Sequence, residues 1–217
     1  MPTAVAVPHA PVTTPFHPPA PTKPATPRPL DVLVSADGVS FPVDRQALSS
    51  QSAVLRDLLS AQQPGRSRLP LPEQAADLAP FLDILLHDAD PFADLSDVLS
   101  ALPAIRLMAK YDTPQRLTYA VTTLKCHVME GAVCPLQVFI VGAALGDGFG
   151  GLGLDLCRTA IVHGDVPTAH PSAQALVAPF WDTVDPAYKA ALTASWAESD
   201  DPKARGNKFI QIMSHLA

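Results

Sequence analysis

From residue 31 onward, polar and apolar residues alternate along the chain with the period of a β-strand. Val32 and Val34 fall on one face of this first segment, and Val39–Val43 forms a second segment of the same kind. Between the two lies the dipeptide Asp37-Gly38, which favours the positive φ angles of a tight reversal. The pattern therefore predicts a β-hairpin.

The period changes to that of a helix directly after the hairpin. Six apolar residues recur there at helical spacing: Ala47, Leu48, Val54, Leu55, Leu58 and Leu59. Ser52 stands between the two helical runs, where its hydroxyl is placed to accept a hydrogen bond from an unpaired amide of the second helix. We therefore predict two consecutive helices, the second of them capped by Ser52.

One more strand and three more helices are expected before residue 112. Leu69 and Leu71 flank Pro70, and this pattern indicates a short edge strand, because proline cannot donate to the interior of a sheet. The three helices are predicted from their apolar residues: first Leu78, Phe81, Leu82, Leu85 and Leu86; then Leu95, Val98, Leu99 and Leu102; then, after Pro103, Ile105, Leu107, Met108 and Tyr111.

The remainder of the chain has the periodicity of helices throughout. Four apolar runs begin with a proline, which suits the first helical position because the missing amide proton costs no hydrogen bond there; they start at Thr113-Pro114, Pro135, Asp185-Pro186 and Asp201-Pro202. Thr113 is expected to cap the first of these helices. Residues 152–162 are expected to form an antiparallel neighbour of the helix that starts at Pro135.

These elements predict an α+β fold. A small three-stranded sheet, made of the hairpin and one edge strand, packs on helices, and an all-helical extension follows it. The first 29 residues hold 10 of the 24 prolines and no periodic apolar face, so a disordered Pro-rich tail is expected there.

The pattern of the hairpin and its two helices resembles the BTB/POZ domain, a protein-interaction module. Eight residues stand at the offsets of the family pattern: Asp31, Val32, Phe41, Val43, Arg45, Leu48, Ser52 and Val54. The chain departs from the pattern at Asp44, where the family usually has His, and at Leu55, where it usually has Phe. The order of hairpin, two helices, strand and further helices is also similar to the layout of this family.

A second motif lies at the end of this region. The run Lys110-Tyr111-Asp112 resembles the close of the domain in a large set of fungal BTB proteins, in which a helical extension also follows. We therefore divide the chain into a Pro-rich tail (1–29), a BTB/POZ-like domain (30–112) and a helical extension (113–217). The resemblance is specific from about Asp31 to Asp112 and absent beyond Val162.

Charge and cysteine content narrow the classes of function. The net charge is −6, and the 15 basic residues form no cluster, so no nucleic-acid partner is expected. Cys126, Cys134 and Cys157 form no paired set and no metal-binding spacing, so we expect reduced cysteines and no metal site. No apolar run reaches the roughly 18 residues that a membrane span needs. An intracellular protein of the cytoplasm or nucleus, without a membrane partner, is expected.

A Gly-rich run offers a different class of function. Gly146–Gly151 contains the G-x-G-x-x-G pattern of dinucleotide-binding sites, and Asp165 lies near the distance of the acidic residue that binds ribose in such sites. That site requires a short strand that ends at the first glycine. Pro135–Leu145 instead has the length of a helix, so a loop between two helices is expected here, with a dinucleotide-dependent enzyme as the alternative.

Two charged residues are the candidate protein-binding site. The resemblance implies that Asp31 and Arg45 line a charged groove at the surface of the domain. A structural ion pair that stabilises the fold is the alternative for the same two residues. No catalytic residue and no cofactor is predicted, because no nucleophile and base stand at a suitable spacing.

The resemblance and the residue patterns together predict a non-enzymatic protein-protein interaction module whose partners are other proteins. An alternative is a substrate adaptor of a cullin-type ubiquitin ligase, because family adaptors use helices behind the domain. Those adaptors also carry a Glu in the loop after the second helix, and this chain has none between Ser60 and Pro72. A homodimer is left open, but without the usual exchange of an N-terminal strand, since the Pro-rich tail cannot supply one.

Overall fold

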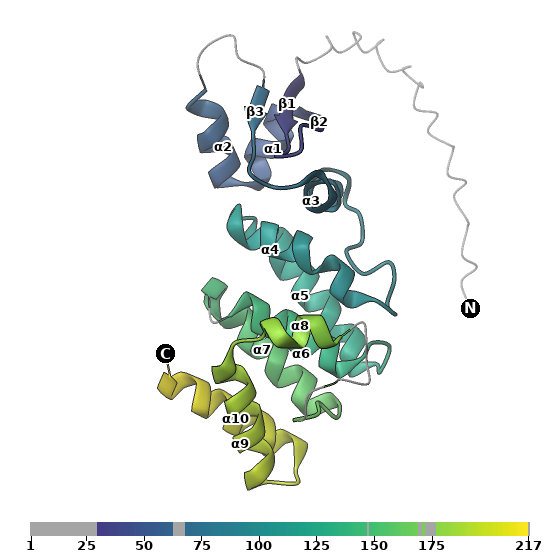
Figure 1. The fold of residues 1–217 in the computed structure, drawn as a ribbon, viewed down its shortest axis with the longest axis vertical. Coiled ribbons are helices and arrows are strands. Elements are labelled where there is room, and N and C mark those ends of the chain that lie inside the picture. Colours follow the sequence, from purple (N-terminus) through teal and green to yellow (C-terminus); the bar gives the residue numbers. More distant parts are fainter. Residues whose placement is uncertain (1–29, 63–67, 147, 169–170, 172–176, 217) are drawn as a thin grey trace, which may run out of the picture.

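The computed structural model describes residues 30–62, 68–146, 148–168, 171 and 177–216. The predicted Pro-rich tail lies outside the described residues. Within them the fold is α+β, with a small three-stranded sheet at one end and a long column of helices below it (Figure 1). The predicted fold class is confirmed.

The sheet has the strand order β2-β1-β3. Strand β1 (Leu30–Val34) pairs antiparallel with β2 (Ser40–Asp44) and parallel with β3 (Arg68–Pro70). Gly38 has φ 84° at the reversal between β1 and β2, a conformation that glycine adopts at little cost. The predicted hairpin and the predicted edge strand are therefore both confirmed.

The buried face of β1 differs from the face that the sequence pattern suggests. Leu33 is fully buried, with Asp31 and Ser35 on the same side, whereas Val32 and Val34 are half-buried on the other side. The hairpin register places Leu33 in the apolar core, whereas Val32 and Val34 point to the opposite face and do not belong to the core.

Four helices and one short 3₁₀ turn complete this end of the molecule. They are α1 (Arg45–Gln51), α2 (Ala53–Ser60), α3 (Ala75–His87), the turn η1 (Val98–Ala101) and α4 (Leu102–Lys110). Ser52 caps α2 as predicted, because its hydroxyl accepts the amide of Leu55 at 3.0 Å. The separate helix predicted over residues 95–102 is wrong: only the turn η1 forms there, and it leads directly into α4.

The extension contains six helices in the described residues. They are α5 (Pro114–Met129), α6 (Pro135–Leu145), α7 (Gly148–His163), α8 (Ala178–Thr183), α9 (Pro186–Glu198) and α10 (Pro202–Leu216). The four helices predicted to begin at prolines are confirmed. Helix α8 was not predicted, because a single turn around the buried Trp181 has no periodic pattern to reveal it.

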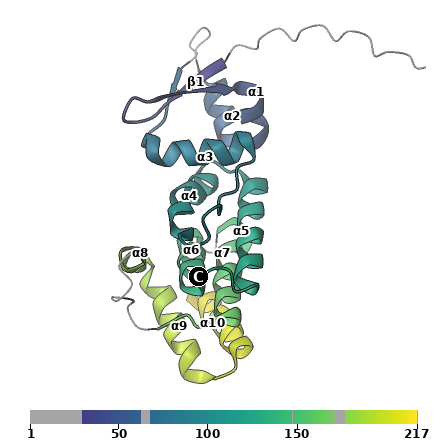
Figure 2. The same ribbon diagram turned by 90° about the vertical axis from the view of Figure 1, so that its right-hand side faces the viewer.

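One predicted cap is wrong. Thr113 precedes α5, but its hydroxyl makes no capping hydrogen bond and donates instead to the carbonyl of Met108 in α4, at 3.1 Å. Thr113 is buried, so the nearest acceptor in the preceding helix binds it. The bond fixes the junction between α4 and α5, and through it the direction in which the extension leaves the sheet end of the molecule (Figure 2).

Candidate protein-binding surface

Asp31 and Arg45 lie side by side because the hairpin register requires it. Asp31 in β1 pairs with Val43 in β2, and Asp44 then ends the strand. The side chain of Asp44 accepts the amides of Gln46 and Ala47 at 2.8 and 3.1 Å and so caps α1. Arg45 is the first residue of that helix and therefore sits next to Asp31.

The two side chains form an ion pair. Arg45 Nε donates to Asp31 Oδ2 at 2.6 Å, and Nη2 lies 3.4 Å from both Asp31 Oδ1 and Gln62 Oε1. The hydrogen bond with Asp31 raises the pKa of Arg45 above its ordinary value. The ion pair expected as the alternative role of these two residues is therefore present, and it joins strand β1 to helix α1.

Burial is uneven across the pair. The side chain of Asp31 is 11% exposed, whereas that of Arg45 is 46% exposed. The carboxylate belongs to the interior, and one side of the guanidinium faces solvent, where it is available to a carboxylate or carbonyl of another protein. Three cavities of about 200–270 Å³ form elsewhere on the described surface, and neither residue lines any of them.

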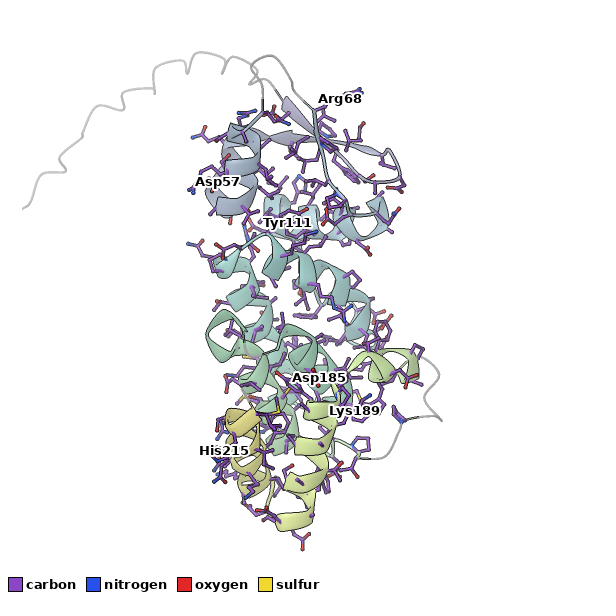
Figure 3. The ribbon with its side chains drawn as sticks, turned by 60° about the vertical axis from the view of Figure 1, so that its left-hand side comes forward. Asp57, Arg68, Tyr111, Asp185, Lys189 and His215 are labelled. Carbon is purple, nitrogen blue, oxygen red and sulfur yellow. The ribbon has the colours of Figure 1, made fainter. Side chains whose placement is uncertain are left out.

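A buried polar cluster that the sequence did not predict holds the first region together. Glu73 follows β3 and is buried, and its carboxylate accepts hydrogen bonds from Lys110 and from the hydroxyl of Tyr111, the latter at 2.6 Å. Tyr111 lies between the sheet end and the helical column (Figure 3). No periodicity marks Glu73, because a single glutamate directly after Pro72 has the pattern of a loop.

The charges of this cluster are set by its contacts. Burial alone would raise the pKa of Glu73, but the hydrogen bonds from Lys110 and Tyr111 outweigh burial and lower it below the ordinary value. Burial, together with the bond to Glu73, raises the pKa of Tyr111 far above its ordinary value. Glu73 is thus ionised and Tyr111 protonated at neutral pH, which is the arrangement that the hydrogen bonds require.

The same cluster gives a physical reason for the run Lys110-Tyr111-Asp112. Lys110 and Tyr111 both bind Glu73, and the carbonyl of Tyr111 accepts the hydroxyl of Ser52 at the start of α2. Asp112 has φ 48°, which ends α4 and turns the chain toward α5. The three residues therefore fasten the end of α4 to both the sheet and α2.

The Gly-rich run lies at the junction of two helices in the structure. The segment that precedes Gly146 is helix α6, where a dinucleotide site would need a strand. Helix α7 starts at Gly148, so the connection between the two helices is shorter than the predicted loop. A Cβ atom on Gly142 would come within 2.7 Å of Cys157 Sγ and of the carbonyl oxygen of Gly153. Gly142 and Gly153, which flank the Gly-rich run, therefore let α6 and α7 approach closely, whereas a Cβ atom on a glycine of the run would meet nothing within 4 Å.

Other candidate chemistry is sparse in the described residues. They contain no group of three or more His, Cys, Asp or Glu side chains that could hold a metal ion. Cys126 and Cys134 are exposed and unbonded, whereas Cys157 is fully buried, which raises the pKa of its thiol well above the ordinary value. No helix in the described ranges has the length and apolar character that crossing a membrane requires.

Two comparisons of the sequence with known proteins found no relative. No protein-family model matches the chain, and no curated protein matches it. Its function is therefore inferred from its own residues and their geometry.

Proposed function

We propose that this chain is a non-enzymatic protein-protein interaction module of the BTB/POZ type, with a helical extension. The observation that carries the proposal is the β2-β1-β3 sheet, flanked by α1 and α2 and fastened to α4 through Glu73. The resemblance implies this order of elements, and the run Lys110-Tyr111-Asp112 has a structural role in it. Because a fold alone does not determine function, the contact with a partner has to be assigned to particular surface residues.

The half-exposed guanidinium of Arg45 is the proposed contact with that partner. The buried carboxylate of Asp31 already holds the guanidinium of Arg45 in place. Arg45 therefore loses little side-chain entropy when an acceptor of the partner binds the guanidinium. A partner that presents a carboxylate or a backbone carbonyl fits this arrangement.

Affinity capture from cell extract tests the proposal. The full chain is compared with Arg45→Ala, and Arg56→Ala serves as the matched control, because Arg56 forms an exposed ion pair with its neighbour Asp57. We expect Arg45→Ala to lose one or more specifically captured proteins that Arg56→Ala retains. Melting curves of all three proteins are needed. A collapse of the Arg45→Ala melting curve would assign the residue to the fold and overturn its role in binding.

Two other outcomes would redirect the proposal. Recovery of a cullin among the captured proteins would narrow the function to that of a ubiquitin-ligase adaptor. A thermal-shift screen with nicotinamide and flavin cofactors is expected to show no stabilisation. A ligand at 100 times its dissociation constant would add about 2.7 kcal/mol, so a clear shift would favour the dinucleotide-dependent enzyme instead.

The proposed compartment is the inside of the cell, in the cytoplasm or the nucleus. It is supported by three cysteines that are unpaired and would be kept reduced there. Imaging of a fluorescent fusion would identify the compartment, and export of the fusion from the cell would contradict it.

A further inference from the structure

One face of α5 has the spacing of a seam between two helices. The outer α5 face consists of Gln115, Tyr119, Thr122, Cys126 and Met129, all of them exposed. They are spaced four, three, four and three residues apart, which places them in one row along a helix. All five are uncharged, although they lie on the surface of a chain whose net charge is −6. Such a row is unusual for a helix face that only meets water.

The large side chains of this row are open to solvent. Tyr119 is 51% and Met129 57% exposed, and they are two of the five exposed large hydrophobic residues of the described chain. The opposite side of α5 is already used, because Leu117, Val121 and Leu124 pack into the core. In Figure 2, α5 forms the right-hand edge of the helical column, and no described element lies outside it.

The two basic residues beside the row, Arg116 and Lys125, form ion pairs with acids outside α5. Arg116 pairs with Asp88, and Lys125 pairs with Asp155 at 2.5 Å. Both cations therefore bind acids of the same molecule. Glu130, which follows the last turn of α5, lies at the far end of the row with its side chain 70% exposed, and its carboxylate is 4.0 Å from the Nδ1 atom of His127.

The row is complementary to itself when two copies run antiparallel. Thr122 is its midpoint, because Gln115 and Met129 are each seven positions away. In an antiparallel pair Met129 of one copy meets Gln115 of the other, and the short Thr122 side chains meet at the two-fold axis. This is the closed geometry of a symmetric dimer.

The ends of the helix add charge complementarity. Thr113 does not cap α5, so the positive amino-terminal end of this helix lacks a side-chain acceptor from that residue. In the antiparallel pair, Glu130 of the second copy reaches this end, and the same contact occurs twice by symmetry. The dipoles of the two α5 helices also run in opposite directions, and their attraction favours the antiparallel arrangement over the parallel one.

We propose that the outer α5 face is a self-association surface, on which a second copy of this chain packs antiparallel about a two-fold axis at Thr122. Helix α5 has 16 residues and is about 24 Å long, so the contact is at the small end of specific interfaces. A transient dimer with a dissociation constant in the micromolar range is therefore expected.

Sedimentation velocity of the full chain, from about 1 to 200 μM, tests the proposal. The sedimentation coefficient of the unmodified chain should rise with concentration. Tyr119→Lys places one charge of each copy in the dimer contact and should raise the dissociation constant of the dimer at least about tenfold. Val39→Lys is the matched control, because Val39 is an exposed apolar residue at the hairpin reversal. Association that is absent in the unmodified chain, or unchanged in a folded Tyr119→Lys variant, overturns the proposal.

A cross-link tests the axis itself. Thr122→Cys is introduced together with Cys126→Ser and Cys134→Ser, and a short bismaleimide should then join two chains. The cross-link should disappear when Tyr119→Lys is added. A dimer that forms without this cross-link would place the interface on another face and sink the proposal. Arg45→Ala is expected to leave both measurements unchanged, so this test and the test of the proposed function fail independently.

Discussion

Glu73 is a buried carboxylate whose two side-chain donors are neighbours in sequence, Lys110 and Tyr111. A buried charge is costly unless donors satisfy it, and here one donor is itself charged while the other is a neutral hydroxyl. The ring of Tyr111 also stacks on Phe81, with centroids 5.6 Å apart. A single side chain therefore joins the polar cluster to the apolar core, and its hydroxyl can be removed without removing the ring.

Tyr111→Phe should lower the free energy of unfolding by about 1–3 kcal/mol, because Glu73 loses its hydroxyl donor and remains buried and ionised. Urea denaturation measures the change. Tyr119→Phe is the control, since Tyr119 is half-exposed, and should change the free energy of unfolding by no more than about 0.5 kcal/mol. Equal effects of the two substitutions would contradict a special role for Tyr111.

The lowered pKa of Glu73 predicts how stability depends on pH. A carboxyl whose pKa is lower in the folded state than its value of 4.5 when unperturbed stabilises the fold above that pH. This stabilisation is lost as the pH falls through the folded-state pKa. Urea denaturation between about pH 5 and pH 3 should therefore show a steeper loss of stability in the unmodified chain than in Glu73→Gln. Some slope should remain in the variant, because the pKa values of Asp37 and Asp94 are also lowered. Parallel pH profiles would count against this assignment.

At the scale of elements, the contact between α6 and α7 depends on glycines that lack a side chain. A Cβ atom on Gly153 would collide with the carbonyl oxygens of Gly142 and Gly146. Backbone atoms cannot move aside as a flexible side chain can, so the two helices would have to separate. The two packing glycines, Gly142 and Gly153, flank the pattern that resembles a dinucleotide fingerprint. A Cβ atom on any glycine within the pattern would meet nothing within 4 Å, so helix packing does not explain those glycines.

Gly153→Ala should destabilise the chain by about 1–3 kcal/mol, because the added methyl group overpacks the crossing of α6 and α7. Gly148→Ala is a matched control at the start of the same helix, where an added Cβ meets nothing within 4 Å. It should be neutral or slightly stabilising, since alanine favours the helix. Thermal or urea unfolding compares the two, and a harmless Gly153→Ala would show that the crossing tolerates more volume.

At the scale of the whole molecule, α4 belongs to both regions. Its buried residues lie in one continuous apolar cluster that extends from Leu33 in the sheet to Phe209 in α10. Helix α4 contacts α3 on one side and α5 and α6 on the other. The boundary predicted after residue 112 rests on the resemblance of Lys110-Tyr111-Asp112, and the apolar core crosses this position without interruption.

A shared core predicts a single cooperative unfolding transition. Both tryptophans, Trp181 and Trp196, lie in the extension, so their fluorescence reports on that region alone. Far-ultraviolet circular dichroism reports on the helices of the whole chain. The two signals should give the same midpoint in urea. Separate midpoints would instead indicate two units that unfold independently.

Much of the fold is visible in the sequence because it depends on local physical chemistry. Gly38 permits the hairpin reversal, Ser52 caps α2, and Pro135, Pro186 and Pro202 begin helices, since each effect acts within a few residues. The ion pair of Asp31 with Arg45 is the structural alternative to the charged groove that the resemblance implies, and the hairpin register places the two residues together.

Other features were decided only by tertiary structure. Strand β1 buries Leu33 and leaves its two valines half-buried, and the hydroxyl of the buried Thr113 donates to the carbonyl of Met108. Glu73 meets Lys110 and Tyr111 across a long stretch of chain, and no local pattern encodes such a contact. The alternation, caps and turns of this protein are thus set by neighbouring residues, whereas its buried polar contacts are set by which surfaces the folded chain brings together.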